Sequence, residues 1–312
     1  MNRCKLSVSR YLVPALVITC WTTATIPYAA QAATLMVDVD GQASATDCNA
    51  FTAAFTTIQA AVNAAAPGDT ISVCPGVYSE QLVVPGSIGN LTIRGFGAGA
   101  TVLRPTTVLQ NTTAIFSGAP VKPIVLVDGA ANVTFESLTI DGSVADSGSA
   151  LFPRCPVVGF YIGVYFRTGS GTINATHVTN MTSSTVCGLG IRAEAATVRV
   201  TTNLVDRYGD AGISCAGPDT QCLVTGNTVR GVGPVDDHSQ GGIDVRNQAA
   251  ATITGNVITD HFLIGAKGVP DSSAGVFLSY AEQPSNPHVL QENIFANNQV
   301  NVQRLGSAAA IK

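Results

Sequence analysis

Hydrophobic and polar positions repeat between residues 188 and 258 in units of two short segments. The first segment of each unit begins at a glycine and alternates aliphatic with polar residues, which is typical of a half-buried β-strand. The second segment holds one asparagine between apolar residues. The three clearest units comprise residues 190–193 with 200–205, 212–215 with 224–229, and 242–245 with 253–258. Each unit therefore predicts two strands.

The asparagines of these units, Asn203, Asn227 and Asn256, lie 24 and 29 residues apart. No unit has enough apolar residues to close a core alone, so neighbouring units must stack. Strands of successive turns would then pair in parallel, with aliphatic residues in inward columns. An asparagine buried at the same corner of every turn can bond to the asparagines above and below it. The pattern predicts a β-solenoid with an asparagine ladder.

The repeat extends in both directions. Thr176 and Leu138 occupy the asparagine position in the preceding turns, and Asn293 occupies it downstream. Strands that begin at a glycine continue as residues 163–166 and 275–278. The whole solenoid is expected to run from about residue 70 to about residue 302, within one domain that covers residues 33–312.

With this repeat, the chain resembles the right-handed parallel β-helix proteins of the pectin-lyase-like class from about Phe55 to Val302. The resemblance implies an all-β fold, a right-handed single-stranded parallel β-helix. It does not imply one activity, because lyases, hydrolases, esterases, epimerases, phage tail proteins and adhesins share this fold.

A short helical pattern precedes the first turns of the solenoid. Ile58, Ala61, Val62 and Ala65 fall on one face of a helix predicted over about residues 56–66. Thr56 or Thr57 can cap its start, and Pro67-Gly68 ends it. We expect this helix to cover the open edge of the first turn, where unpaired strands would otherwise recruit other chains.

Residues 1–32 have the pattern of a secretory signal peptide, with cleavage expected before Ala33. A lipoprotein acceptor at Cys20 is an alternative, as is an anchored helix, although the apolar run from Tyr11 to Thr25 is short and interrupted by Pro14. A signal peptide predicts a secreted or periplasmic protein without a membrane span in the mature chain.

Charge and composition restrict the partners. The formal charge is −4, and removal of the leader with its three basic residues makes it −7, so nucleic acid is not expected as a partner. Charged residues are scarce and Thr, Val, Ala, Gly and Asn abundant, which suits stacked strands and tight corners. We expect Ala308-Ala309-Ala310 to cap the C-terminal end only weakly, which leaves self-association open.

Six cysteines follow the predicted cleavage point, and an even number in an exported chain indicates disulfides. Proximity in the sequence favours three pairs, namely Cys48 with Cys74, Cys155 with Cys187, and Cys215 with Cys222. A zinc site is the alternative, but the sequence has no Cys-x-x-Cys pair and no partnered histidine.

Two acidic stretches near the start invite a chemical interpretation. Residues 38–41, Asp-Val-Asp-Gly, faintly resemble a calcium loop, but the later acidic ligands are missing and a turn is favoured. Tyr78 and Glu80 are interpreted as parts of the first corner of the solenoid rather than as catalytic groups. No cofactor is therefore expected, with calcium left open.

The alternation along the glycine strands places a set of polar residues on the outward face, where we expect them to face solvent. An elongated groove with arginines, carboxylates and an aromatic ring suits a sugar polymer, because rings stack and arginine forks bind hydroxyls or carboxylates. A cross-strand ladder of ion pairs that serves only solubility is the alternative. The residues are Tyr165, Arg167, Arg192, Glu194, Asp244 and Arg246.

The loop 235–240 resembles the Asp-Pro-His stretch that precedes a strand in mannuronan C5-epimerases and related alginate lyases. This resemblance implies that Asp236 and His238 are catalytic. The reaction would be proton abstraction at C5 of a uronate, with His238 as base, Arg246 or Arg192 neutralising the carboxylate, and Tyr165 or Asp237 as acid. A bland loop, with Asp capping a turn and His exposed, is the alternative.

Asp206 and Asp260 follow the asparagine corner in two different turns and share an edge of the solenoid. Paired carboxylates there could hydrolyse glycosidic bonds, although turn formation is the favoured interpretation.

The sequence as a whole predicts an exported β-helix protein that binds a polysaccharide, most concretely a lyase or C5-epimerase of a uronate-containing glycan. The alternative is a non-catalytic adhesin, scaffold or accessory factor.

Overall fold

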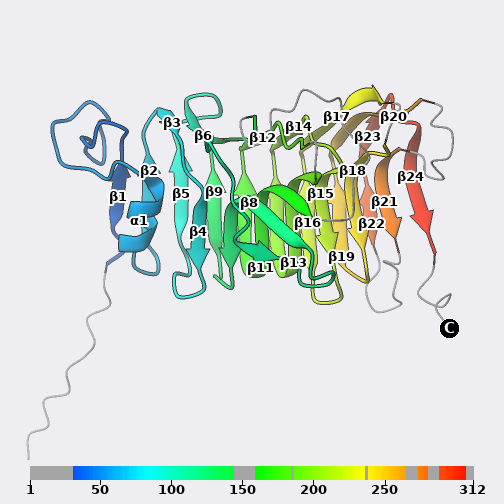
Figure 1. The fold of residues 1–312 in the computed structure, drawn as a ribbon, viewed down its shortest axis with the longest axis horizontal. Helices are drawn as coiled ribbons and strands as arrows, with labels where there is room; N and C mark the ends of the chain where they lie inside the picture. The colour runs from blue at the N-terminus through cyan, green and yellow to red at the C-terminus, as the bar shows by residue number, and fades with distance from the viewer. Residues whose placement is uncertain are drawn as a thin grey trace, which may run out of the picture. The chain divides into compact units, whose positions relative to one another are not determined.

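Three faces of short parallel strands enclose one hydrophobic core in the computed structural model, which describes residues 31–143, 159–183, 186–235, 238–264, 273–279 and 288–306. The strands belong to the compact unit that covers Ala32–Lys312 (Figure 1). The predicted signal peptide thus lies almost entirely outside the described residues.

Each turn of the chain contributes strands to the three faces in succession. Face 1 consists of β4 (Leu82–Pro85), β8 (Pro120–Asp128), the first halves of β11 (Phe160–Asn174) and β13 (Cys187–Thr201), β15 (Ala211–Ala216), β18 (Gly241–Arg246), β21 (Ala274–Ser279) and β24 (Val300–Leu305). Face 2 consists of β1 (Thr34–Val37), β2 (Thr70–Val73), β5 (Thr92–Gly95), β9 (Val133–Glu136), the second halves of β11 and β13, β16 (Gln221–Thr225), β19 (Ala250–Thr254) and β22 (Val289–Gln291). Face 3 consists of β3 (Gly76–Tyr78), β6 (Thr101–Leu103), β10 (Thr139–Asp141), β12 (His177–Thr179), β14 (Leu204–Asp206), β17 (Thr228–Val235), β20 (Val257–Leu263) and β23 (Ile294–Ala296).

Hydrogen bonding joins faces 1 and 2 into one sheet of 16 strands, because β11 and β13 span both faces. Each of these long strands changes direction at a residue in the left-handed region, Thr168 with φ of 64° and Ala195 with φ of 48°. The pairings between described strands are parallel, except that the short β7 (Thr112–Thr113) runs antiparallel to β8. The predicted single-stranded parallel β-helix is confirmed.

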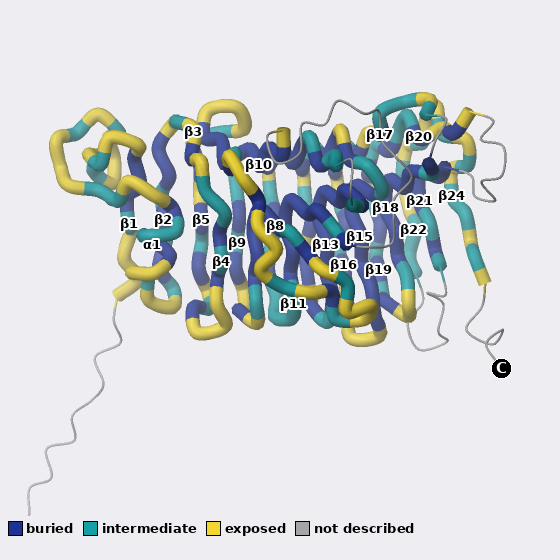
Figure 2. Tube along the Cα trace, in the orientation of Figure 1, coloured by how far each residue is buried: buried dark blue, intermediate teal, exposed yellow. Residues whose placement is uncertain are grey.

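The inward columns of face 1 are those expected from the glycine strands. Val164, Ile191, Ile213 and Ile243 stand at one level of neighbouring strands, and all four are buried in the main core. Buried positions follow the strands, whereas exposed positions gather at the turns (Figure 2). The period of two along each strand therefore sorted inward from outward side chains correctly.

The asparagine ladder is also confirmed. The side-chain amide of Asn203 donates to Oδ1 of Asn227, that of Asn227 to Asn256, and that of Asn256 to Asn293, each at 2.9 Å. Each Oδ1 also accepts the backbone N–H of the preceding asparagine, at 2.9 to 3.0 Å. Thr176 heads the ladder through its backbone N–H, which donates to Asn203. Every rung is therefore satisfied by its neighbours.

The predicted capping helix is α1 (Ile58–Ala64), and Thr57 is its N-cap. Ile58, Ala61 and Val62 are buried against the first turns of the core. The carboxylate of Glu80 accepts the N–H groups of Ile58 and Gln59 at 2.7 and 2.8 Å, which satisfies two donors that the helix leaves free. This confirms the structural interpretation of Glu80.

Tyr78 is likewise structural. Its buried hydroxyl donates to the backbone oxygen of Cys74 at 2.9 Å. Burial, followed by the charges of Asp38 and Glu80, raises the pKa of this phenol above its usual range.

Within the described residues, no helix is long and apolar enough to cross a membrane.

Two of the predicted disulfides, Cys48–Cys74 and Cys215–Cys222, are confirmed. Cys187 is also disulfide-bonded, and its predicted partner, Cys155, lies outside the described residues. The second bridge closes the short loop between β15 and β16, at the corner where face 1 turns into face 2.

Candidate functional site

The outward side chains of face 1 form two rows across neighbouring strands, as the sequence predicted. One row runs through Tyr165, Arg192, Ser214, Asp244 and Phe277. The other runs through Arg167, Glu194, Ala216, Arg246 and Ser279. Because adjacent strands lie about 4.8 Å apart, each row brings its polar groups close together.

The expectation that these side chains face solvent is wrong for most of them. Tyr165 and Glu194 are 0% exposed, Asp244 is 1% exposed and Arg192 is 4% exposed. For Tyr165, Glu194 and its partner Arg192, the cause is the segment of residues 104–119 between β6 and β8, called the strap here, which crosses the outward side of face 1 (Figure 2). Alternation along a strand shows which way a side chain points, but not what lies over it.

The strap is fixed to face 1 by specific contacts. The N–H of Ile115 donates to Oε2 of Glu194 at 2.6 Å, and Nε of Arg167 donates to the carbonyl oxygen of Thr113 at 3.2 Å. Ala114 is buried in a second apolar cluster on the outward side. The ring of Phe116 packs against Gly217, where even a Cβ would not fit.

Beneath the strap, Glu194 is the centre of a saturated network. Its Oε1 accepts from Nε of Arg192 at 2.8 Å, and its Oε2 accepts from the hydroxyl of Tyr165 at 2.5 Å. The guanidinium of Arg192 also lies 4.5 Å from the centre of the Phe160 ring, a favourable cation–π contact. Burial, and then the charge of Glu194, raises the pKa of Tyr165 far above its usual range.

The next two strands carry polar groups that are buried but not saturated. Among the described residues, Oγ of Ser214, Oδ1 of Asp244 and Nε of Arg246 have no hydrogen-bond partner. Arg246 pairs with Oδ2 of Asp244, and the pKa of Arg246 is raised, mainly by the Asp244 charge. About a third of the Arg246 side chain is exposed, so this pair opens toward solvent.

Asp210 joins this group from the residue before β15, and the sequence reasoning missed it. Desolvation raises the pKa of its carboxyl, and Asp244 raises it further, whereas the charges of Arg246, Arg192 and His238 oppose the rise. The one signal in the sequence was that Asp210 stands just before a glycine strand. In the next turn, the loop that carries His238 stands at the corresponding place, before the strand that begins at Gly242.

His238 is buried, with 6% of its surface exposed, so the exposed histidine of the alternative interpretation is wrong. Its effect on Asp210 places it at the same group of charges. Asp236 and Asp237, the other acidic residues of this loop, lie outside the described residues. Arg167 pairs with Asp128 of β8 at 3.0 Å and also bonds to the strap.

The carboxylates of Asp206 and Asp260 do not form a pair, since β17 lies between their strands β14 and β20. Asp206 instead accepts from His177, Thr179 and Arg230, and the hydrogen bonds from these partners outweigh desolvation and lower its pKa. The favoured structural interpretation of Asp206 is in accord with this network.

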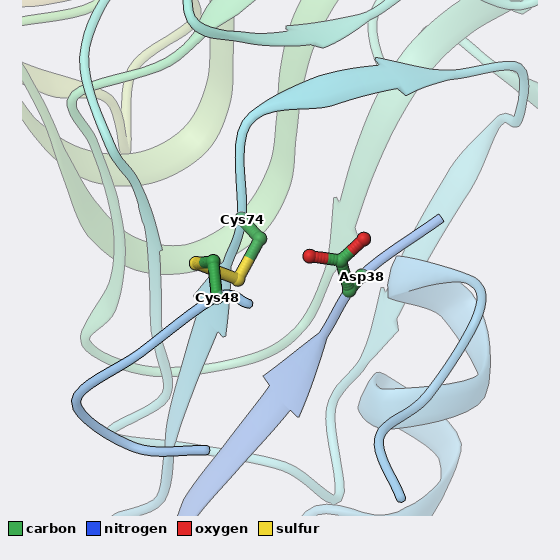
Figure 3. A group of neighbouring side chains, drawn as sticks. All are labelled: Asp38, Cys48 and Cys74. Atoms are coloured by element: carbon green, nitrogen blue, oxygen red, sulfur yellow. A yellow bond between two sulfur atoms is a disulfide. The ribbon is translucent and has the colours of Figure 1, made fainter. Parts of the chain in front are cut away.

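Asp38, Cys48 and Cys74 form the one group of potential metal ligands that lies close together in the described parts of the chain (Figure 3). The two sulfurs are bonded to each other and cannot act as thiolate ligands. Residues 38–41 form a turn closed by the N–H of Gly41 and the carbonyl of Asp38, as expected.

Comparison with known proteins gives one family. The model described as the right-handed beta helix region matches residues 123–310. A comparison with curated proteins found no match.

Solved structures with a similar fold include pectin methylesterase PemA from Erwinia chrysanthemi, at 13% identity over 89% of this chain and 95% of its own, with a TM-score of 0.47. The pectin methylesterase from carrot is 13% identical over 88% and 89%, with a TM-score of 0.47. Pectate lyase Pel9A is 14% identical over 88% and 79%, with a TM-score of 0.44. At these values the likeness assigns no role to any residue.

Proposed function

The chain belongs to the right-handed β-helix family, and we propose that it is an exported protein that binds and chemically modifies a polysaccharide on face 1. The proposed site comprises Asp210, Ser214, His238, Asp244 and Arg246. It lies on and before strands β15 and β18, beside the strap.

One observation carries the proposal, namely that Ser214, Asp244 and Arg246 bury polar atoms without partners among the described residues. Leaving such an atom unpaired costs about 1 to 3 kcal/mol, so a ligand or a water that completes the bonding is favoured there. A donor, an acceptor and a cation side by side match the hydroxyl and carboxylate groups of a sugar acid. Rows that repeat from strand to strand also suit a polymer with a repeating unit.

The environments of the carboxyl groups favour acid–base chemistry. Asp244 is paired with Arg246, whereas burial raises the pKa of Asp210 and keeps it protonated to a higher pH. A carboxyl group whose pKa is raised by burial is suited to act as a general acid.

In the concrete form of the proposal, the substrate is a uronate and the reaction is β-elimination. Arg246 binds the substrate carboxylate and stabilises the charge that develops when the C5–H bond breaks. His238 takes that proton, the C4–O bond breaks, a C4–C5 double bond forms, and Asp210 protonates the leaving oxygen. Return of a proton to C5 from the opposite side, without loss of the C4 oxygen, would instead give the epimer.

The covered residues have a different part in this proposal. The hydroxyl of Tyr165 donates to Glu194, so Asp210 takes the acid role that the sequence offered to Tyr165. Arg192, Glu194 and Arg167 hold the strap beside the site and act as positioning residues. Asp236 stands outside the described residues and has no step here.

Export is part of the proposal because disulfides persist in oxidising compartments, and the predicted leader points the same way. Self-association through the last turn also stays a proposal, since Leu290, Phe295 and Val302 are only partly buried there. Sedimentation of the mature chain over a range of concentrations tests it.

A non-catalytic binder is the second candidate, and the saturated network of Glu194 favours it. The charges beneath the strap are paired with one another, so no reaction is needed to explain them. The groups of the proposed site, beside the strap, could bind a glycan without changing it chemically.

The deciding experiment treats alginate, polygalacturonate and glycosaminoglycans with the mature chain, and follows ultraviolet absorbance of unsaturated products and the C5 epimer ratio by NMR. Activity that is lost in His238→Ala and Arg246→Met, and kept in Arg94→Met on face 2, supports the enzyme. Glycan binding that Arg246→Met abolishes, without any product, supports the binder. Absence of both activity and binding refutes the proposal.

A further inference from the structure

Strands β17 and β20 continue past the edge of face 3 as a two-stranded ribbon. After a shift in register, Gly233 pairs with His261, Pro234 with Phe262, and Val235 with Leu263. Beside this ribbon is a depression of about 400 Å³, lined by Gly233, Pro234, Asp260, Phe262 and Asn297. That volume is within the range of small-molecule sites, about 300 to 1,000 Å³.

The ring of Phe262 is held on the outside of the ribbon by the strand period. Its neighbours His261 and Leu263 are buried, with exposures of 0% and 5%, so Phe262 must point outward. It is 41% exposed. A large apolar ring that a regular strand presents to solvent, opposite a proline, is a flat surface on which the C–H face of a ligand can pack.

The polar side of the depression offers hydrogen-bond acceptors. The carboxylate of Asp260 accepts from Nδ2 of Asn297 at 3.1 Å and from the hydroxyl of Thr259 at 2.9 Å. Each carboxylate oxygen has two acceptor positions, so both can accept a further hydrogen bond from a ligand. None of the described residues that line the depression is basic.

The base of the depression is anchored in the core. His261, which follows Asp260, bonds through its two ring nitrogens to the hydroxyl of Tyr208 and to Oδ1 of Asn298. The His261 backbone N–H also donates to Asn298. Asp260 is therefore presented from a fixed position, and a ligand would not have to order it on binding.

We propose that this depression is a second carbohydrate site, which binds one unit of a neutral glycan with the sugar ring on Phe262 and its hydroxyl groups donating to Asp260. A negative carboxylate, with no cation among the described lining residues, favours hydroxyl donors and disfavours uronates. The site uses none of the residues of the acid–base group on face 1 and does not depend on the activity proposed there.

Isothermal titration of the mature chain with cellohexaose and xylohexaose tests the inference, with an oligogalacturonate of equal length as the acidic probe. We expect a neutral hexasaccharide to bind, and Phe262→Ala to weaken it about tenfold or more, as loss of an aromatic anchor does. Asp260→Asn should also weaken it. Phe51→Ala removes an equally large ring that is 94% exposed elsewhere, and should bind as the parent does.

Thermal unfolding followed by circular dichroism verifies that each variant is folded, and Phe262→Leu, which keeps apolar bulk without the ring, is the second variant at this position. Binding that survives in Arg246→Met separates this site from face 1. The inference is overturned if neither neutral hexasaccharide binds, if Phe262→Ala and Phe262→Leu bind as tightly as Phe51→Ala, or if the oligogalacturonate displaces the neutral sugar.

Discussion

Replacement of Asn227 by alanine removes the central rung of the asparagine ladder. The side chain of Asn227 donates to Asn256 and to the carbonyl oxygen of Val200, and it accepts from the backbone and side-chain N–H groups of Asn203. Four hydrogen bonds are therefore lost from a residue that is 1% exposed. The backbone N–H of Asn203 is left buried without this acceptor.

The magnitude follows from these losses. A lost hydrogen bond costs about 1 kcal/mol net, and a buried donor left unpaired costs about 1 to 3 kcal/mol. We therefore expect Asn227→Ala to lower the free energy of unfolding by roughly 3 to 5 kcal/mol. Asn293→Ala is the matched control, because the last rung makes three bonds and is only partly buried. Its cost should be about half as large.

Guanidinium unfolding followed by far-ultraviolet circular dichroism measures both variants, since the single tryptophan, Trp21, lies in the predicted leader. Hydrogen exchange of the Asn203 amide supplies a local readout, and it should accelerate in Asn227→Ala. A loss below about 1 kcal/mol, or one no larger than that of Asn293→Ala, would refute the reasoning, because buried amides would then not depend on their neighbours.

Three further predictions concern the helix cap, the strap and a buried histidine. Glu80→Ala should destabilise α1 by about 2 kcal/mol, because two helix N–H groups lose the carboxylate that accepts from them. Amide hydrogen exchange at Ile58 should become faster, and less so in Glu80→Gln; unchanged exchange would contradict the prediction. Ala114→Asp places a charge where the strap packs on face 1, so it should release the strap and make residues 104–119 more sensitive to proteases. Ser117→Asp, at an exposed position of the strap, should not; equal proteolytic cleavage of the two variants would count against the strap contacts. Burial lowers the pKa of His261 from 6.5 to about 4, so the native state excludes a proton that the unfolded chain binds. Stability should therefore fall by roughly 3 kcal/mol as the pH drops from 6.5 to 4, and less in His261→Gln; identical pH dependence of the two unfolding free energies would disprove it.

Much of the fold could be predicted from the sequence because each turn repeats the same physical requirement. The glycine strands, the inward columns and the asparagine positions follow from local pattern, and the structure confirms all three. The capping helix was also predictable, since its apolar period and Thr57 are local signals.

The burial of Tyr165, Arg192 and Glu194 could not be predicted in this way, because it depends on the strap. The contact between Ile115 and Glu194 joins residues 79 positions apart and leaves no periodic trace in the sequence. Asp210 was missed for a related reason. Its pKa is raised mainly by burial within the fold, and further by Asp244 on the next turn, whereas its own sequence context resembles an ordinary turn.

The strap also changes how the turns depend on one another. In a solenoid, each turn touches only the turns next to it, so a local opening can spread one turn at a time, as in a one-dimensional chain of coupled units. Successive rungs of the ladder lie 24, 29 and 37 residues apart and couple only such neighbours. The strap connects β6 to β8 and bonds to β13. Because β11 lies between β8 and β13 in the sheet, the strap couples turns that are not adjacent. The strands from β8 to β13 should therefore open as one cooperative block rather than one by one.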